Sequence, residues 1–85
     1  MPTISMFYGI IIRMYADDHN PPHIHVIYGA NEAMYTFDGE VLEGKIPNKQ
    51  HKLVSAWIEL HKDELEADWI LARDQEPMFK IPPLV

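Results

Sequence analysis

Apolar residues recur at a spacing of two between Ile4 and Ile46, and many of them are β-branched or aromatic. This alternation is typical of β-strands, because successive side chains of a strand point to opposite faces. It predicts five strands, over residues 4–6, 10–15, 23–28, 33–37 and 41–46. Since the connections between them are short, we expect the strands to form an antiparallel meander.

The clearest turn signal is Asp38-Gly39, between the last two predicted strands. An Asp-Gly pair tolerates the positive φ angles of a type I′ hairpin turn, so this turn would pair Phe37 with Glu40. In that register five residues share one face, which we predict to be the core face: Ala33, Tyr35, Phe37, Leu42 and Ile46.

The length of the loop at residues 29–32 decides which face of the sheet carries His23 and His25, because a shift of one residue reverses a strand. A loop of even length places Tyr28 opposite Ala33 and turns both histidines outward, beside Thr36 and Met34. A loop of odd length would bury both histidines. We favour the even loop, because it gathers the apolar residues of the strand on the core face.

From Asn48 onward the apolar period lengthens to three or four residues, which is the helical pattern. Asn48 is predicted to be the N-cap, because Asn is favoured at that position. An unbroken helix over residues 48–73 would be about 39 Å long, longer than we expect so small a domain to be. Asp63 followed by Glu66 has the form of a capping box, so we predict a break near residues 61–63.

Residues 76–85 contain three prolines and cannot continue a helix, yet they carry several large apolar side chains. We expect this tail to dock on the sheet or the helices. Together the elements predict an α+β fold, an antiparallel β-meander followed by two C-terminal helices packed on one face. A single domain is expected, with a sheet half over residues 1–47 and a helical half and tail over residues 48–85.

Composition narrows the functional classes. The 85 residues are 47% hydrophobic and 24% charged, as in ordinary globular domains. The net charge of −6 disfavours loose binding to nucleic acid or anionic membrane. The absence of cysteine excludes disulfides, thiolate metal sites and a cysteine nucleophile. With no long apolar run and no charged segment before one, we expect a cytoplasmic protein without a membrane span.

The chemistry is expected between Asp17 and His25, where three of the five histidines lie within seven residues. His23 and His25 are two residues apart on a predicted strand, so their imidazoles project from one side, with Cα atoms roughly 7 Å apart. His19 precedes a stiff Pro-Pro step that could turn the chain back toward them. Because neutral imidazole is a common ligand of transition metals, His19, His23 and His25 are candidate ligands of a divalent ion such as zinc.

The same residues allow two other interpretations. His23 and His25 could act as base and acid in phosphodiester cleavage without a metal, with Arg13 holding the phosphate. Arg13 could instead pair with Asp17 in a purely structural role. Finally, a His-X-His strand after a turn-rich segment is often only a solvated polar face. The residues alone leave these alternatives open.

The helical half carries simpler candidates. Trp57 and Trp69 are predicted core anchors, His61 is predicted to be a core or interface histidine with one hydrogen bond, and His51 is predicted to be exposed. Acidic residues concentrate between residues 59 and 76. They form a solvated helix face or, alternatively, a surface for a basic partner.

One block is long and specific: His19-Asn20-Pro21-Pro22-His23-Ile24-His25-Val26. With the Gly39–Gly44 segment, the two tryptophans and the closing Glu76-Pro77, it makes nearly the whole chain resemble a small bacterial family called domain of unknown function 4160. No active-site assignment comes with this resemblance.

The resemblance implies a partner. Members of that family are short cytoplasmic proteins whose genes often lie beside a gene of domain of unknown function 2442, and the pair has the look of a toxin-antitoxin module. The expected function is therefore a subunit of a toxin-antitoxin-like pair that acts by protein contact or by RNA cleavage. RNA is disfavoured by the net charge. The alternatives are a metal-binding module and a purely structural interaction domain, including a homo-oligomer.

Overall fold

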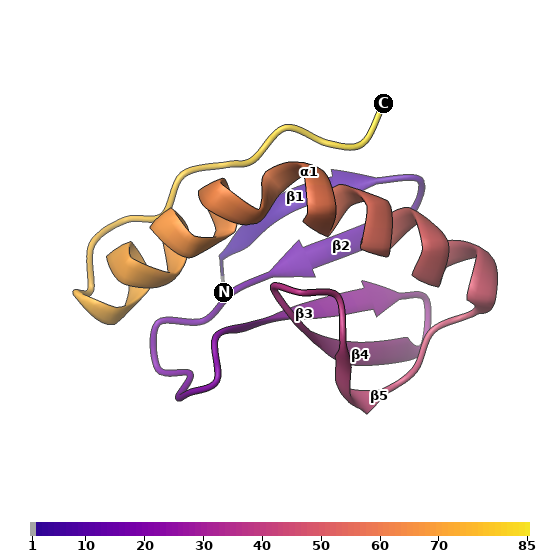
Figure 1. The fold of residues 1–85 in the computed structure, drawn as a ribbon, viewed down its shortest axis with the longest axis horizontal. Coiled ribbons are helices and arrows are strands. Elements are labelled where there is room, and N and C mark those ends of the chain that lie inside the picture. Colours follow the sequence, from indigo (N-terminus) through magenta and orange to yellow (C-terminus); the bar gives the residue numbers. More distant parts are fainter. Residues whose placement is uncertain (1) are drawn as a thin grey trace.

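The computed structural model describes residues 2–85 as a five-stranded antiparallel sheet followed by one long helix. The strands lie in the sheet in chain order (Figure 1): β1 (Thr3–Phe7), β2 (Ile10–Arg13), β3 (His23–Tyr28), β4 (Asn31–Thr36) and β5 (Val41–Gly44). The helix α1 (Asn48–Arg73) follows them. The predicted α+β meander is therefore confirmed. Within the described residues, no helix combines the length and apolar character that a bilayer span requires.

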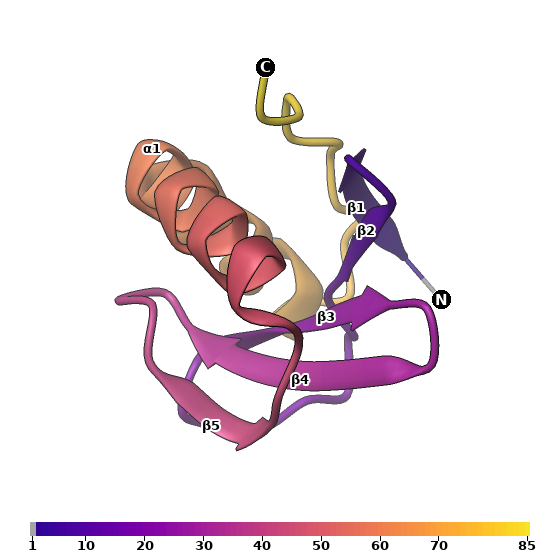
Figure 2. The same ribbon diagram turned by 90° about the vertical axis from the view of Figure 1, so that its right-hand side faces the viewer.

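The sheet is strongly curled, with β1 and β2 standing at a steep angle to β3, β4 and β5, and α1 lies in its hollow (Figure 2). The core fills the space between them. Ile12 and Val26, neighbours in the sheet, are completely buried, and Trp57 of α1 packs its ring 5.4 Å from that of Phe7. Sheet half and helical half thus share one hydrophobic core.

The loop between β3 and β4 has the predicted even parity but only two residues, Gly29 and Ala30, so Tyr28 pairs with Asn31 and not with Ala33. Gly29 has a positive φ of 60°, as tight hairpin turns require. The parity leaves Ile24 and its alternate neighbours in the core, as expected.

The hairpin between β4 and β5 differs from the prediction. The Thr36 N–H donates to the Glu40 carbonyl at 2.8 Å, which leaves a three-residue loop in which Gly39 has a φ of 89°. Phe37 therefore lies in the loop, buried, and does not pair with Glu40. The register then shifts by one residue between Met34 and Tyr35.

That shift explains why Leu42 was wrongly assigned to the core. Tyr35 pairs with Val41 and Met34 with Glu43, so Leu42 is the extra residue of a β-bulge and is 45% exposed. The other four residues of the predicted core face are buried: Ala33, Tyr35, Phe37 and Ile46.

The prediction of two helices is wrong, because a single helix, α1, spans the 26 residues. His61 has non-helical angles (φ −121°, ψ 21°), so the expected break survives only as a kink. Buried residues lie on both sides of it, Trp57 before and Leu65 after, because a bent helix stays in contact with a curled sheet. The helix runs lengthwise along the molecule (Figure 1).

The predicted cap is also wrong. Pro47 occupies the N-cap position of α1, and no side chain caps it. Asn48 is the first helical residue. Proline at the entry of a helix fixes a suitable φ, −56° here, without needing a side-chain hydrogen bond.

The tail docks as expected, running back beside α1 and β1 (Figure 2). The Ile81 N–H donates to the Ile4 carbonyl at 2.8 Å, and the indole N–H of Trp57 donates to the Pro82 carbonyl at 2.9 Å. Ile81 is 2% exposed. The tail thereby covers the outer edge of β1, a device that protects a sheet from pairing with other chains.

A buried carboxyl group joins the tail to the helix. Asp68 is completely buried, and its Oδ1 accepts the N–H of Phe79 at 3.0 Å, while its Oδ2 has no partner. Burial raises the pKa of Asp68; the Phe79 N–H opposes this shift and the charge of Glu64 adds to it. Asp68 is thus not part of the acidic surface that the sequence suggested.

The tail should be necessary for stability. Ile81→Ala leaves a cavity beside β1 and should lower the free energy of unfolding by about 3 kcal/mol, within the usual range for buried Ile→Ala changes. Urea denaturation followed by tryptophan fluorescence measures this loss. Val85→Ala, in the same tail but fully exposed, should change it little. Equal stability of the two variants would show that the tail contributes nothing.

Asp68 should make stability depend on pH. Because its pKa is raised in the folded state, its contribution is complete below the ordinary value of 3.8 and is lost as pH rises through the raised value. Asp68→Asn removes this titration, so the stability of the variant relative to the native chain should rise between pH 4 and pH 8. Urea denaturation across this range measures the difference. Glu66→Gln, an exposed neighbour, is the control, and parallel curves for Asp68→Asn and the native chain would contradict the assignment.

Candidate functional site

Strand β3 places two histidines on the side of the sheet opposite to its buried apolar residues. Ile24 and Val26 are completely buried in the core, so the alternation of the strand sends His23 and His25 the other way. Their ring centroids are 5.2 Å apart. The predicted pairing of the two imidazoles on one side of a strand is therefore confirmed.

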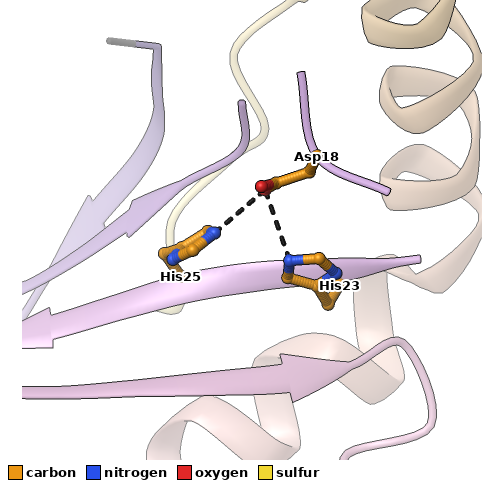
Figure 3. A group of neighbouring side chains, drawn as sticks. All are labelled: Asp18, His23 and His25. Carbon is orange, nitrogen blue, oxygen red and sulfur yellow. Dashed lines mark hydrogen bonds and ion pairs between the residues drawn. The ribbon is translucent and has the colours of Figure 1, made fainter. Parts of the chain in front are cut away.

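The loop before β3 brings a carboxylate to both rings. Asp18 Oδ2 lies 3.3 Å from His23 Nε2 and 2.9 Å from His25 Nε2 (Figure 3). Each of the three residues offers a ligand atom within 4.8 Å of those of the other two. Two imidazole nitrogens and one carboxylate oxygen thus converge from β3 and a single loop.

The contacts of the two Nδ1 atoms determine which ring nitrogen of His23 and His25 carries a proton and how each ring is oriented. His23 Nδ1 lies 2.7 Å from the Pro21 carbonyl, which can only accept, so Nδ1 carries the proton. In neutral His23 the Nε2 lone pair then faces Asp18, and this atom is buried without a hydrogen bond. His25 Nδ1 lies 3.4 Å from Glu32 Oε2. Metal-binding histidines are oriented in this way, with the second nitrogen held by a carbonyl or carboxylate.

The site is buried on one side and accessible on the other. The side chain of His23 is 4% exposed, with its ring 5.6 Å from that of Trp69 on α1. The side chains of His25 and Asp18 are 14% and 20% exposed. The ring of Tyr15 contacts that of His25 edge-on, with 4.6 Å between the ring centroids. The predicted parity is right, but the expected solvated face is wrong, because the loop before β3 and Trp69 enclose His23.

The other predicted residues of the site, His19 and Arg13, have different surroundings. His19 is exposed and is not a member of the converging group. Arg13 lies opposite His25 in the register of β2 and β3. Among residues 2–85 it forms no ion pair, so the alternative in which it pairs with Asp17 is not realised.

Sequence reasoning missed Asp18 as a donor. The strand period gives the directions of His23 and His25, whereas the direction of a loop residue depends on how the whole loop packs. The signal available was chemical: an aspartate at the start of a histidine-rich segment is itself a candidate oxygen ligand.

The remaining histidines are structural. The hydroxyl of Tyr35 and Nδ1 of His51 share a hydrogen bond of 2.7 Å, and burial raises the pKa of Tyr35. His51 is thus partly buried, not exposed as predicted. His61 is partly buried, contacts Trp57 and makes one hydrogen bond, to Glu64, as expected.

Comparison with known proteins places these features in a family. A family model described as domain of unknown function (DUF4160) matches residues 9–70. The matched segment contains Arg13, Asp18, His23 and His25, whereas β1 and the tail lie outside it. No curated protein and no solved structure gives a significant match.

Proposed function

The chain belongs to the family described as domain of unknown function DUF4160, and, because that description assigns no chemistry, we propose a function from the site itself. The protein binds a divalent transition-metal ion, zinc in the first place, through Asp18, His23 and His25. This proposal replaces His19 by Asp18 in the ligand set expected from the sequence.

The orientation of His23 carries the proposal. Its Nδ1–H donates to the Pro21 carbonyl, so its Nε2 presents a lone pair to the Asp18 carboxylate 3.3 Å away. Two acceptors that face each other in a buried place repel unless a cation lies between them. Either a proton or a metal ion removes this repulsion, and a metal ion would also replace the proton of the 2.9 Å hydrogen bond between His25 Nε2 and Asp18 Oδ2.

The separations of Asp18 from the two imidazoles suit zinc. Ligand atoms at 2.0–2.2 Å from a tetrahedral ion are about 3.3 Å apart. The separations from Asp18 Oδ2, 3.3 Å to His23 and 2.9 Å to His25, are close to this value. Three protein donors leave a position open to solvent or a ligand, which is the arrangement of zinc sites that act on substrates. A zinc ion with an open position acts as a Lewis acid toward the molecule that binds at that position.

Zinc should stabilise the protein in a way that depends on the three donors. Zinc at a hundred times its dissociation constant adds about 2.7 kcal/mol, which corresponds to a rise in Tm of roughly 10–20 °C for a domain of this size. Lowering the pH to 5 should abolish the rise, because protonated imidazole cannot ligate. Differential scanning calorimetry and isothermal titration measure both effects.

Variants separate the ligand sets. His23→Ala, His25→Ala and Asp18→Asn should each abolish saturable zinc binding, whereas His19→Ala, in the same loop, should retain it. Retention in Asp18→Asn with loss in His19→Ala would restore the set of three histidines. Unchanged binding in His23→Ala with His25→Ala would remove the proposal.

We also propose that the protein acts by contact with another protein, as one member of a toxin-antitoxin-like pair. The edge strand β5 supports binding of a partner protein, because its four residues are all exposed. They include the apolar residues Val41 and Leu42, which are 42% and 45% exposed. Exposed edge strands bind partner strands.

The paired-gene hypothesis is tested by expressing this protein alone and then together with a neighbouring protein of the domain of unknown function 2442 family. Growth arrest that the neighbour relieves, and that His23→Ala abolishes, supports a toxin whose histidines act in RNA cleavage. Co-purification without arrest, lost in Leu42→Lys but kept in Leu60→Lys, supports contact through β5, since Leu60 is an exposed leucine on α1. If neither arrest nor co-purification occurs, the paired-gene hypothesis is wrong.

A further inference from the structure

Arg13 lies beside the proposed metal site. Its Cα is paired with that of His25 in the antiparallel register of β2 and β3. Directly opposed residues of such a pair point to the same face, with Cβ atoms about 5 Å apart, so the long Arg13 side chain lies within reach of the His25 side of the site.

Within residues 2–85, the guanidinium group of Arg13 has no hydrogen-bond or ion-pair partner. Arg13 Nε is buried and makes no hydrogen bond, and the Arg13 side chain has no ion pair among residues 2–85. The sequence nevertheless contains 13 acidic residues, two of them in the adjoining loop. Burying the Nε–H donor of a charged group without an acceptor is unfavourable, and Arg13 as a whole is only partly buried, so the position is suited to an anion that comes from outside the chain.

We propose that Arg13 and the metal ion together bind the phosphate group of a small phosphomonoester. This inference rests on the metal site proposed above. Arginine presents a planar fork that matches two phosphate oxygens, while a third oxygen can occupy the open position of the metal. A divalent ion, the Asp18 carboxylate and the Arg13 guanidinium leave two positive charges, which a phosphate dianion neutralises and a monovalent carboxylate does not. The other acids nearby are Asp17 and Glu32, and both are exposed and therefore screened by solvent.

The charge of the whole chain selects a small ligand over a polymer. A net charge of −6 repels a long polyanion, and Arg13 is one of only seven lysines and arginines. A terminal phosphate needs only the local charges of the site. The ligand class is therefore a free phosphomonoester, of which inorganic phosphate is the simplest form.

Cobalt-loaded protein provides the test, because the visible absorption of Co²⁺ responds to the ligands that it binds. Inorganic phosphate and a nucleoside 5′-monophosphate should each change the spectrum saturably. A short RNA without a terminal phosphate should not. Arg13→Gln should weaken phosphate binding at least tenfold while the affinity for Co²⁺ stays the same. Arg73→Gln, the other arginine of the chain and exposed at the end of α1, should bind phosphate like the native protein.

The outcomes distinguish this inference from the proposal on which it rests. If Co²⁺ binds but phosphate leaves the spectrum unchanged, or if Arg13→Gln and Arg73→Gln behave alike, the inference fails and the metal site stands. If the native protein binds neither Zn²⁺ nor Co²⁺, both fail. Should Arg13→Gln not fold, Arg13→Lys keeps the charge without the fork, and undiminished phosphate affinity would then overturn the role of Arg13. RNA binding as tight as that of the monophosphate would overturn the assignment to a small ligand.

Discussion

The two-residue period of β3 links the core to the site. Ile24 and Val26 are completely buried beneath α1, and this burial fixes the orientation of His23 and His25 because neighbours on a strand point in opposite directions. A slip by one residue would turn the apolar pair away from the core and turn the two imidazoles into it. The hydrophobic effect that stabilises the sheet therefore also holds the two candidate ligands together.

The curl of the sheet then gives the site its enclosed side. Since β1 and β2 rise beside α1 (Figure 2), the C-terminal half of the helix comes down over the start of β3. Trp69 packs against both Phe37, at 6.1 Å, and His23, at 5.6 Å. The kink at His61 and the docked tail let one helix follow this curved surface from end to end. The packing that completes the core thus also removes His23 from solvent.

Two unsatisfied polar atoms lie on the strands that form the site. His23 Nε2 and Arg13 Nε are both buried without hydrogen bonds, on adjacent strands. Buried polar groups normally find partners, and those that do not reduce stability. Such exceptions recur at sites that a ligand completes, and a metal ion with a bound anion would satisfy both atoms here. Asp68 is different in kind, because its unpaired oxygen lies where the tail meets the helix.

Local pattern by itself determined much of this protein: five strands in a meander, a helical second half, a docked tail and two histidines on one side of β3. These features follow from periods of two and of three to four residues, which reflect contacts between near neighbours in the chain. Only the tertiary structure decided that Asp18 and not His19 meets the imidazoles, that α1 bends without breaking, and that Leu42 leaves the core through a bulge. Each of these depends on packing between segments distant in sequence, the loop against β3 and the helix against the curled sheet, and no local period encodes such contacts.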